Sequence, residues 1–480
     1  MTAIPPRLER FFLPEVPTQQ LAARLGAAGY RAYLVGGTVR DALIDRVRPD
    51  EVNDIDIATN ARPDDIESVV KGWADTVWLA GKRFGTIGCT RQGEVFEITT
   101  FRADVYRPES RKPEVTFSDD IEVDLSRRDF TVNAMAMTLD HPDGAGPELV
   151  DPYDGRIDLV ARRLRTPLAP EISFEDDPLR MLRAARFVAT LGFEPDPALV
   201  GAIDDMHERL KIVSAERIRD ELSKLIVADD PSSGLWLCSR TGLANEFLPE
   251  LNSMQLEQDP IHRHKDVLAH TIAVVAKTSP RLRIRLAALL HDVGKPRTRG
   301  FGPQGVTFHH HEVVGARMAR ERMGALRYPN ELVDDVTLLV ELHLRFHTYR
   351  MGWTDSAVRR YVRDAGPLLD DLNELTRCDC TTRDARKAAA LGRRMDELEA
   401  RIAELREHEA LSQIRPALDG KQVMKFLGVS PGPIVGDALS FLLELRLEEG
   451  PMDEEESYLQ LAEWAHRRGI ERGSTHDPNA

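Results

Sequence analysis

Two aspartates stand two residues apart in a segment whose pattern predicts a β-strand. Asp54 and Asp56 belong to the stretch DIDIAT, residues 54–59, in which polar and apolar residues alternate. Successive side chains of a strand point to opposite faces, so both carboxylates are expected on one face. Carboxylates held this close repel each other unless cations neutralise them, and oxygen ligands of this kind suit Mg²⁺. A solvated strand edge shows the same pattern, so the pair alone leaves both interpretations open.

A glycine turn lies upstream of these aspartates. AYLVGG, residues 32–37, predicts a buried strand that ends in a turn, and TVRDALI then begins a helix. Gly36 and Gly37 have no side chains, so their backbone N–H groups can approach phosphate oxygens. Arg40 can add positive charge beside a triphosphate. The turn and the paired aspartates together indicate a nucleotide site, where two metal ions can activate a hydroxyl and hold a leaving pyrophosphate.

A second group of chemically active residues lies further along the chain. Nine of the fourteen histidines fall between residues 262 and 347, and His291 stands beside Asp292 at the end of an apolar segment. Imidazole and carboxylate ligands together suit Mn²⁺, Fe²⁺, Ni²⁺ or Zn²⁺, and Mg²⁺ where carboxylates dominate. A single buried histidine is usually a core residue, but this grouping favours a metal site. The other members of the set lie on separate predicted helices: His270, His311, His343 and Asp379.

Length and composition set the frame for both sites. The 480 residues are too many for one core and suggest about three domains, and 42% apolar with 30% charged residues is typical of a globular protein. No apolar run is long enough to span a membrane, and the first residues lack a signal-peptide layout, so a cytoplasmic protein is expected. A net charge of −15 argues against non-specific binding to nucleic acid. The four cysteines are expected to be reduced.

The elements that must position these residues change character along the chain. The first 160 residues mix predicted strands and helices, and the segments after about residue 170 show helical periodicity. We therefore expect an α+β head with a mixed sheet, followed by all-α neck, metal-binding and C-terminal domains. The end of the chain after about residue 470 is expected to be disordered. The expected domain boundaries are 17–165, 166–255, 256–385 and 386–470.

LVGGTVRDALI followed by DIDIAT resembles the head of the polymerase-β-like superfamily. More narrowly, it resembles the class II branch that holds bacterial CCA-adding tRNA nucleotidyltransferases and poly(A) polymerases. EITTFRADVYRPESRKPEVTFSDDIEVDLSRRDFTVNAMAM, residues 97–137, continues the resemblance, including a mobile loop at 104–117. The resemblance implies Asp54, Asp56 and Glu97 as catalytic carboxylates with Mg²⁺, although Glu97 could instead pair with Arg102 across strands. Gly36, Gly37 and Arg40 would then hold the triphosphate.

The segment RRDFTVNAM supplies Arg128, Asp129 and Asn133, which the resemblance places around the incoming nucleotide. Asp129 and Asn133 stand four apart and would share one helix face. Either side chain could instead cap that helix.

EDDPLRMLRAARF, residues 175–187, is the second strong point of resemblance. Arg180, Arg183 and Arg186 recur at three-residue steps, which is also typical of a solvated basic face. The family uses an Asp and an Arg here in place of a template, and these correspond to Asp177 and Arg180, with Arg183 beside the nucleotide. The family commonly has Glu before this aspartate, where this chain has Asp176.

Hydrogen-bond chemistry agrees with recognition of the incoming base by this Asp–Arg pair, which is called the base reader below. Cytosine and adenine both present an amino donor beside a ring-nitrogen acceptor, whereas uracil and guanine present the reverse. A carboxylate only accepts and a guanidinium only donates, so one Asp and one Arg match C and A. Mismatched partners would cost about 1–3 kcal/mol each. This pairing explains a choice of C and A without a template, but it does not explain their order.

The histidine set resembles the HD superfamily of metal phosphohydrolases, which implies a divalent metal of uncertain identity on His270, His291, Asp292 and Asp379. The set permits hydrolysis of a phosphoester, or a vestigial domain that only packs or holds RNA. The expected function is addition of CCA to the 3′ end of tRNA from CTP and ATP, without membrane or DNA as a partner. The alternatives are poly(A) synthesis and a metal-dependent phosphohydrolase as the main activity.

Overall fold

The computed structural model describes residues 6–44, 54–107, 110–139, 147–256, 266–302, 305–348, 353–380, 385–408 and 414–470. The side chains of residues 103–115 lie outside that description, as does the C-terminal segment 471–480 for which disorder was expected. The chain divides into two units, Met1–Asn252 and Ser253–Ala480. The finer division into four domains stays a prediction.

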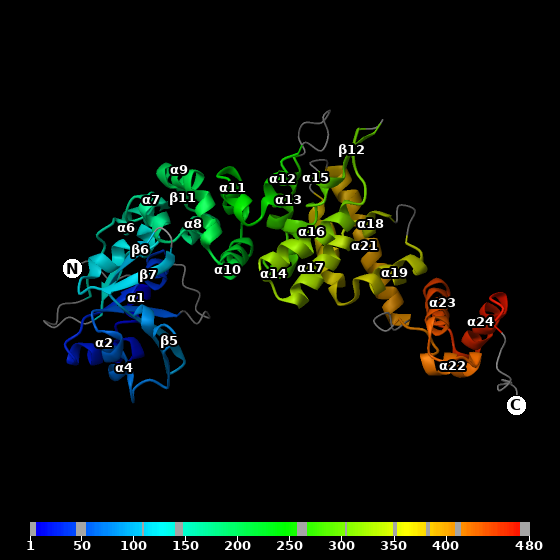
Figure 1. The fold of residues 1–480 in the computed structure, drawn as a ribbon, viewed down its shortest axis with the longest axis horizontal. Helices are drawn as coiled ribbons and strands as arrows, with labels where there is room; N and C mark the ends of the chain where they lie inside the picture. Colours follow the sequence, from blue (N-terminus) through cyan, green and yellow to red (C-terminus); the bar gives the residue numbers. More distant parts are fainter. Residues whose placement is uncertain are drawn as a thin grey trace. The chain divides into compact units, whose positions relative to one another are not determined.

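The first unit contains a mixed sheet, drawn in blue and cyan in Figure 1. Its strand order is β3-β4-β5-β2-β1-β8-β9. Only β2 and β5 run parallel to each other, and the other neighbours are antiparallel. The strands are β1 (Ala32–Val35), β2 (Ile55–Thr59), β3 (Thr76–Trp78), β4 (Thr86–Arg91), β5 (Glu94–Thr100), β8 (Ala136–Thr138) and β9 (Leu149–Val150).

Alternation along the central strands decides which face of the sheet is covered. Ile55 and Ile57 of β2 and Phe96 and Ile98 of β5 are almost fully buried. On that face α4 (Pro63–Val70) packs against β4 and β5, and Trp73 just beyond it sets its ring edge-on to Phe96. Because side chains alternate, the residues between these apolar positions face the other way. Burial of one face therefore directs Asp56 and Glu97 to the opposite face.

A hairpin of β6 (Arg102–Arg107) and β7 (Ser110–Phe117) occupies the segment for which a mobile loop was expected. The pairing runs from Arg102 opposite Phe117 to Arg107 opposite Ser110, while residues 108–109 lie outside the described part. The other helices before residue 165 are α1 (Pro6–Glu9), α2 (Pro17–Ala27), α3 (Gly37–Leu43), α5 (Ile121–Ser126) and α6 (Gly155–Ala161).

The segment after the sheet is helical and is organised around α8 (Leu179–Leu191), which packs against α10 (Ala215–Ile226) and α11 (Ser232–Arg240) (Figure 1). α11 can approach α8 closely because Gly234 has no side chain; a Cβ there would lie only 2.4 Å from the carbonyl oxygen of Ala185. α7 (Pro170–Asp176) ends where Asp177 turns extended before Pro178, a residue type that disfavours helix before it. The remaining helices here are α9 (Pro197–Met206) and α12 (Pro249–Ser253).

Helices also dominate the second unit, where α17 (Asn330–Leu342) packs against both α14 (Leu282–Leu290) and α16 (His311–Ala325). One antiparallel hairpin, β12 (Arg299–Gly302) with β13 (Gly305–Phe308), adds to the expected all-α arrangement. The helices up to residue 379 are α13 (Val267–Lys277), α14 (Leu282–Leu290), α15 (Lys295–Thr298), α16 (His311–Ala325), α17 (Asn330–Leu342), α18 (Arg345–Thr348), α19 (Asp355–Ala365) and α20 (Leu369–Asp379).

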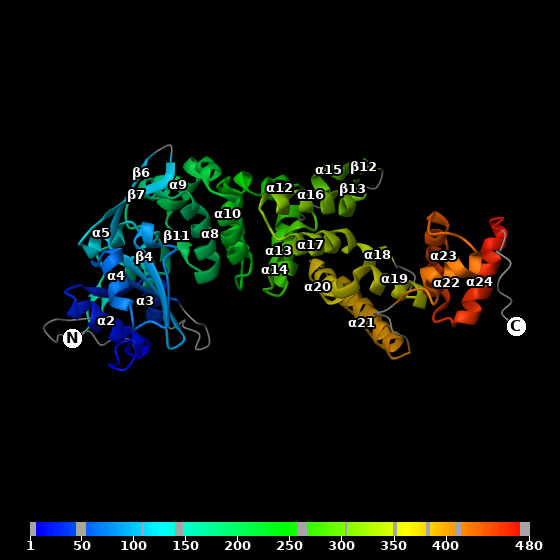
Figure 2. The same ribbon diagram turned by 60° about the horizontal axis from the view of Figure 1, so that its bottom comes forward.

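The last helices are α21 (Ala385–His408), α22 (Gly420–Leu427), α23 (Pro433–Glu449) and α24 (Glu454–Arg467), coloured orange to red in Figure 2. The last three share a core that includes Phe426, Leu442 and Trp464. Within the described residues, no helix is both long and apolar enough to cross a bilayer. The expected order, a mixed-sheet head followed by helices, is confirmed.

Candidate active site and metal centre

The sheet brings three carboxylates together on its open face. Asp56 of β2 pairs in register with Glu97 of β5, and Asp54 immediately precedes β2. The pKa of Asp56 is raised to about 6: burial is the main cause, Arg128 opposes it, and the charges of Glu97 and Asp54 add to the rise. Burial and Asp54 likewise raise the pKa of Glu97. This crowding of negative charge is what bound cations would relieve, so the donor set fits divalent metal ions.

The glycine turn lies directly beside this cluster. Gly36 has φ +72°, and a Cβ there would lie 3.1 Å from both Asp56 Oδ2 and Arg128 Nη1. A side chain at this position would therefore be strained and would crowd both charged groups. Arg128 is itself held by the buried Asp124, whose Oδ2 accepts a hydrogen bond from Nη2 at 3.2 Å. The structure thus brings Gly36 and Arg128 to the carboxylates, as the sequence predicts.

Arg40 is held by protein side chains. It binds Asp41 through Nε and Nη2 at 2.7 and 2.9 Å, and its Nη1 donates to Asn133 Oδ1 at 2.6 Å. Asn133 Nδ2 in turn donates to Asp129 Oδ1 at 2.9 Å. The expected α-helix shared by Asp129 and Asn133 is wrong: only Thr131–Asn133 forms a single 3₁₀ turn, and Asp129 lies before it. Their direct hydrogen bond brings the two side chains together instead.

The network continues onto α8 and α10. Arg183 Nε donates to Asp129 Oδ2 at 2.9 Å, and Arg183 Nη1 donates to Glu221 Oε1 at 3.3 Å. Arg186 Nε donates to the other oxygen of Glu221 at 2.6 Å. Burial alone would raise the pKa of Asp129, but Arg183 and the Asn133 hydrogen bond hold it well below its usual range. Arg183 and Arg186 are thus engaged with carboxylates and Arg180 is buried, so the solvated basic face is excluded.

Asp177 and Arg180 approach the same region from the start of α8. Asp177 Oδ2 accepts from Arg217 Nη2 at 2.7 Å, and Asp177 Oδ1 accepts from the backbone of Leu179. Arg180 is buried; its Nη1 donates to Ser173 Oγ at 2.9 Å and its Nη2 to the backbone oxygen of Arg127. Both side chains are therefore fixed in position by neighbouring residues.

These groups surround one cavity of about 310 Å³. Asp56, Arg128, Asp129, Asp177, Arg180 and Arg183 all line it. Sequence reasoning missed several of its other lining residues, although the doubled arginine of RRDF pointed equally to Arg127. The additional lining residues are Val35, Ile57, Thr86, Thr99, Arg102, Arg127 and Arg217.

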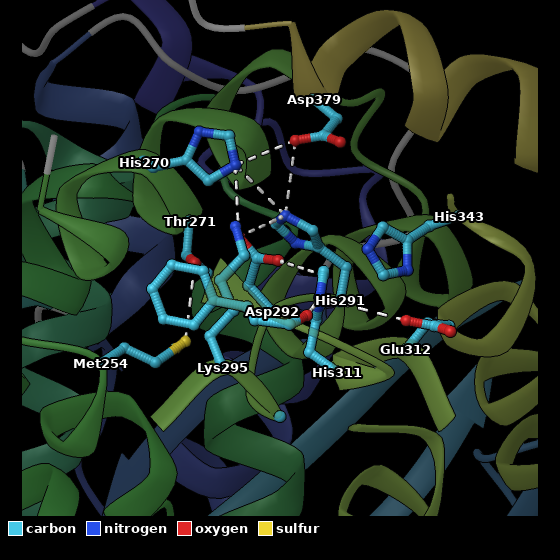
Figure 3. Close-up of polar contacts among 12 residues, drawn as sticks. Met254, His270, Thr271, His291, Asp292, Lys295, His311, Glu312, His343 and Asp379 are labelled. Carbon is cyan, nitrogen blue, oxygen red and sulfur yellow. Dashed lines mark hydrogen bonds and ion pairs between the residues drawn. The ribbon is translucent and has the colours of Figure 1, made fainter. Parts of the chain in front are cut away.

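A separate cluster forms in the second unit, where the side chains of His270, His291, Asp292, His311, His343 and Asp379 lie close together (Figure 3). His270, His311 and Asp379 belong to α13, α16 and α20, and the other three directly follow α14 and α17. His270 Nε2 lies 2.9 Å from Asp379 Oδ1 and 3.4 Å from Asp292 Oδ2. His291 Nε2 lies 3.2 Å from the same oxygen of Asp292. The four predicted ligands thus meet, and Lys295 Nζ also contacts Asp292 Oδ2 at 2.6 Å.

His311 and His343 complete a second group on the other side of Asp292. His311 Nε2 lies 3.4 Å from Asp292 Oδ1, and the ligand atoms of Asp292, His311 and His343 lie within 4.8 Å of one another. The Nε2 atoms of both histidines are buried and have no hydrogen-bond partner. The sequence order placed these two residues in the set without assigning them as ligands.

The Nδ1 atoms, which point away from the cluster, contact backbone oxygens that hold each imidazole ring in its orientation. The Nδ1 atoms of His291, His311 and His343 lie 2.8, 2.8 and 2.6 Å from the backbone oxygens of Ala288, Phe308 and Val340. Such contacts place a proton on Nδ1 and turn Nε2 toward the cluster. Burial opposes a charge on His291, but Asp292 and Asp379 raise its pKa to about 10, so a metal bound by its Nε2 would displace a proton. Burial, with the charge of His291, lowers the pKa of His343 to about 3, so this ring is neutral. The cluster therefore fits divalent metal.

Three protein-family models match the chain. The "Poly A polymerase head domain" matches residues 32–165, the "Probable RNA and SrmB- binding site of polymerase A" matches 192–255, and the "HD domain" matches 267–414. The first model covers the sheet with its three carboxylates, and the third covers the histidine cluster.

Individual relatives agree with these models. The A-adding tRNA nucleotidyltransferase of Deinococcus radiodurans is 34% identical over 453 residues, which are 90% of this chain and 95% of that protein. The CCA-adding enzyme of Lactobacillus gasseri is 41% identical over 237 residues, which are 49% of this chain and 56% of that enzyme.

A solved structure extends the similarity to the fold. The crystal structure of the Bacillus stearothermophilus CCA-adding enzyme in complex with CTP is 25% identical, with a TM-score of 0.69, and the match covers 97% of this chain and 99% of that one. The resemblance identified in the sequence is confirmed. This chain is a nucleotidyltransferase and belongs to the family that comprises the A-adding and CCA-adding tRNA nucleotidyltransferases.

Proposed function

We propose that this enzyme builds the CCA end of tRNA, using CTP and ATP and releasing pyrophosphate. The observation that carries the proposal is the single cavity lined by both Asp56 of the sheet and the Asp177–Arg180 pair of the neck. Such a cavity can hold the reacting phosphates at one end and a base at the other. Membership of the family supports tRNA as the acceptor, and the acceptor's 3′-hydroxyl attacks the α-phosphate of the nucleotide.

Asp54, Asp56 and Glu97 would hold the metal, taken here as Mg²⁺. When bound, Mg²⁺ supplies activation of the hydroxyl and neutralisation of the leaving pyrophosphate. Arg128 lies beside Asp56 and binds the triphosphate, while Gly36 and Gly37 leave room for it. Asp129 and Asn133 grip the ribose, and Arg40 contributes by holding Asn133, to which it donates at 2.6 Å. A bond forms from the hydroxyl oxygen to the α-phosphorus, the bond to pyrophosphate breaks, and the hydroxyl proton is released.

Asp177 and Arg180 read the Watson–Crick edge of the base. The carboxylate accepts from the amino group of C or A, and the guanidinium donates to the adjacent ring nitrogen. Both side chains are already fixed, Asp177 by Arg217 and Arg180 by Ser173. Fixed donors and acceptors lose little freedom when a base binds, which favours discrimination. Arg183 acts indirectly, by holding Asp129 in position.

The test is incorporation onto a tRNA that lacks its CCA end, with CTP and ATP supplied singly and together. Addition of two C and one A, stopping there and absent in Asp54→Ala, supports the proposal. Long A tails on both tRNA and an unstructured oligo(A) primer, with CTP ignored, would replace it with poly(A) synthesis.

A second candidate is addition of the terminal A only. It is favoured by one observation: the relative that matches over 95% of its length is named an A-adding enzyme. The Asp177–Arg180 pair accepts A as well as C, so the reader does not separate the two activities. A tRNA that already ends in CC separates them. Extension of that tRNA by one A, with no use of CTP on the shorter tRNA, would identify A addition.

For the second unit we propose a metal-dependent phosphohydrolase activity on a phosphoester. His270, His291, Asp292 and Asp379 would hold a divalent metal, which when bound polarises a phosphoryl oxygen and activates water. The buried Nε2 of His343 has no hydrogen-bond partner, and that of His311 faces Asp292 Oδ1 at 3.4 Å, which supports a ligand there. Opening of a 2′,3′-cyclic nucleotide to the nucleoside monophosphate by water, with Mn²⁺, Ni²⁺ or Mg²⁺, tests it. Loss in His291→Ala with retention in Asp54→Ala supports the proposal; no hydrolysis with any metal contradicts it.

A further inference from the structure

Trp78 lies on the face of the sheet that carries the carboxylates Asp56 and Glu97, and it takes no part in the proposed reaction. Trp78 lies on β3, the edge strand of the sheet, and 38% of its surface is exposed. Trp is highly buried on average, so an indole with this much exposed surface can bury more of it against a ligand. Trp78 is also absent from the residues that line the nucleotide cavity. It is therefore available to a different ligand.

Strand register places Trp78 in line with the carboxylates. Trp78 pairs with Gly88, Gly88 pairs with Glu97, and Glu97 pairs with Asp56. Directly paired residues point to the same face of a sheet, so the indole shares the face of Glu97 and Asp56. Neighbouring strands lie about 4.8 Å apart, which puts the Trp78 backbone about 14 Å from that of Asp56.

Gly88 lets the indole lie across β4 toward the carboxylates. A Cβ at Gly88 would lie 2.0 Å from Cε2 and Nε1 of Trp78, so the ring occupies the space that a side chain would fill. Gly88 is buried beneath it. The ring thus lies one strand spacing, about 5 Å, from the strand that carries Glu97. Its outward side is open to solvent.

The position of the nucleotide assigns this side of the site to the acceptor, an argument that rests on the proposed function. Gly36 and Arg128 approach Asp56 from the side of β1 and α3. β5, β4 and β3 extend from Asp56 in the opposite direction. In phosphoryl transfer the attacking and leaving oxygens are roughly in line, on opposite sides of phosphorus. The nucleotide cavity also reaches Thr99 of β5 and Thr86 of β4, whereas Trp78 lies level with Glu97 in the strand register, beside that cavity and on the side of Asp56 away from Gly36. With the pyrophosphate near Gly36, this position suits the RNA that brings the attacking 3′-hydroxyl.

We propose that Trp78 stacks against a base at the 3′ end of the acceptor RNA and so positions the terminal hydroxyl beside Asp54, Asp56 and Glu97. Aromatic stacking tolerates any base, because every base has a π-face. This suits a site at which the 3′-terminal base changes after each addition. Gly88 contributes by letting the ring reach across β4.

The test compares Trp78→Ala, Trp78→Phe and the control Val77→Ala, a change on the opposite face of the same strand where 41% of the residue is exposed. The KM for a tRNA ending in CC and the KM for ATP are measured separately. Trp78→Ala is expected to raise the KM for RNA about 5- to 150-fold, the range expected from loss of one stacked base. The KM for ATP is expected to change less than about 2-fold, Trp78→Phe to recover most of the loss, and Val77→Ala to match the wild type.

Three results would overturn the proposal: an unchanged KM for RNA, a raised KM for ATP instead, or equal losses in Trp78→Phe and Trp78→Ala, which would indicate a packing role. If Trp78→Ala fails to fold, Gly88→Ala keeps the indole but displaces it, and the same rise in the KM for RNA is expected. An inactive wild-type enzyme would contradict the proposed function. Tryptophan fluorescence would then decide: quenching by the RNA that persists in Trp78→Phe would sink the stacking role.

Discussion

Arg183 of the neck helix α8 binds Asp129 of the head, with Nε 2.9 Å from Oδ2, and its Nη1 lies 3.3 Å from Glu221 on α10. One guanidinium thus joins a residue proposed to grip the nucleotide to the helices that carry the base reader. Asp129 and Glu221 are both buried, so each carboxylate depends on this partner for part of its charge compensation.

Arg183→Met is expected to destabilise the first unit, because it leaves two buried carboxylates short of a partner. Breaking a buried ion pair from one side costs about 3–5 kcal/mol, and the partial exposure of Arg183 reduces this to about 2–3 kcal/mol. Denaturant unfolding measures the loss. Arg320→Met, which removes an exposed charge paired with the exposed Asp334, is expected to cost less than about 1 kcal/mol. Equal losses in both variants would contradict the coupling.

The pH dependence of stability should also reveal the low pKa of Asp129. Arg183 and Asn133 hold the pKa of Asp129 below its usual range in spite of burial. A depressed folded-state pKa stabilises the protein above the unfolded-state value of about 3.9 and loses that effect as the pH falls below it. The cost of Asp129→Asn is therefore expected to be largest near pH 7 and to shrink between about pH 4 and pH 2. A cost that does not vary with pH would refute this account.

Asp56→Asn is expected to separate activity from stability. Nucleotide incorporation should fall at least about a thousandfold, because a metal-binding carboxylate is lost. Burial raises the folded-state pKa of Asp56 to about 6, so the wild-type protein loses stability as the pH rises through 6. Without added metal the variant should be more stable than the wild type by about 1–3 kcal/mol at pH 7.5, and equal to it below pH 4. A destabilised variant at pH 7.5 would contradict this.

The base reader predicts a change of specificity in Asp177→Asn. An amide both donates and accepts, so the preference for CTP over UTP should fall by about 5- to 150-fold. Arg217→Gln removes the partner 2.7 Å from Asp177 and should weaken the preference less, because the carboxylate remains. Competition between CTP and UTP in single-turnover incorporation measures both. Unchanged preference in Asp177→Asn would mean that the base is read elsewhere.

Metal stoichiometry tests the cluster of the second unit. The two oxygens of Asp292 face different histidines, Oδ2 toward His270 and His291 and Oδ1 toward His311. Asp292→Asn should therefore remove all metal bound by this unit, whereas His343→Gln should remove at most one ion. Elemental analysis after loading with Mn²⁺ checks both, with Asp54→Ala as a background that removes binding in the head. Full occupancy in Asp292→Asn would contradict the arrangement.

The sequence predicted the carboxylate cluster well because its signals are local. Alternation in DIDIAT fixes the face of Asp56, and the glycines of AYLVGG mark the turn beside it. The His291–Asp292 pair likewise follows an apolar helix whose end can be located from the sequence. Each of these features depends on residues within one or two turns or strands of the chain.

Long-range pairing could not be predicted in the same way. The partner of Arg183 is 54 residues away, and that of Asp177 is 40 residues away. An arginine pattern with period three gives no direct sign of the carboxylates that face it, so the solvated-face alternative stayed open. The expected helix across Asp129 and Asn133 also failed, because spacing alone cannot distinguish an α-helix from a short 3₁₀ turn stabilised by a side-chain hydrogen bond.

Backbone pairing joins the segments on either side of the boundary near residue 165. β10 (Arg163–Leu164) pairs in parallel with β11 (Glu194–Pro195), and the buried Asp158 binds both Arg163 and Arg165. Residue 165 is therefore a poor junction for a chimera that takes its base-reading helix from a relative. A chimera joined there would have to match backbone, buried charge and the Arg183–Asp129 pair at once. Junctions near residue 252 would leave all three intact.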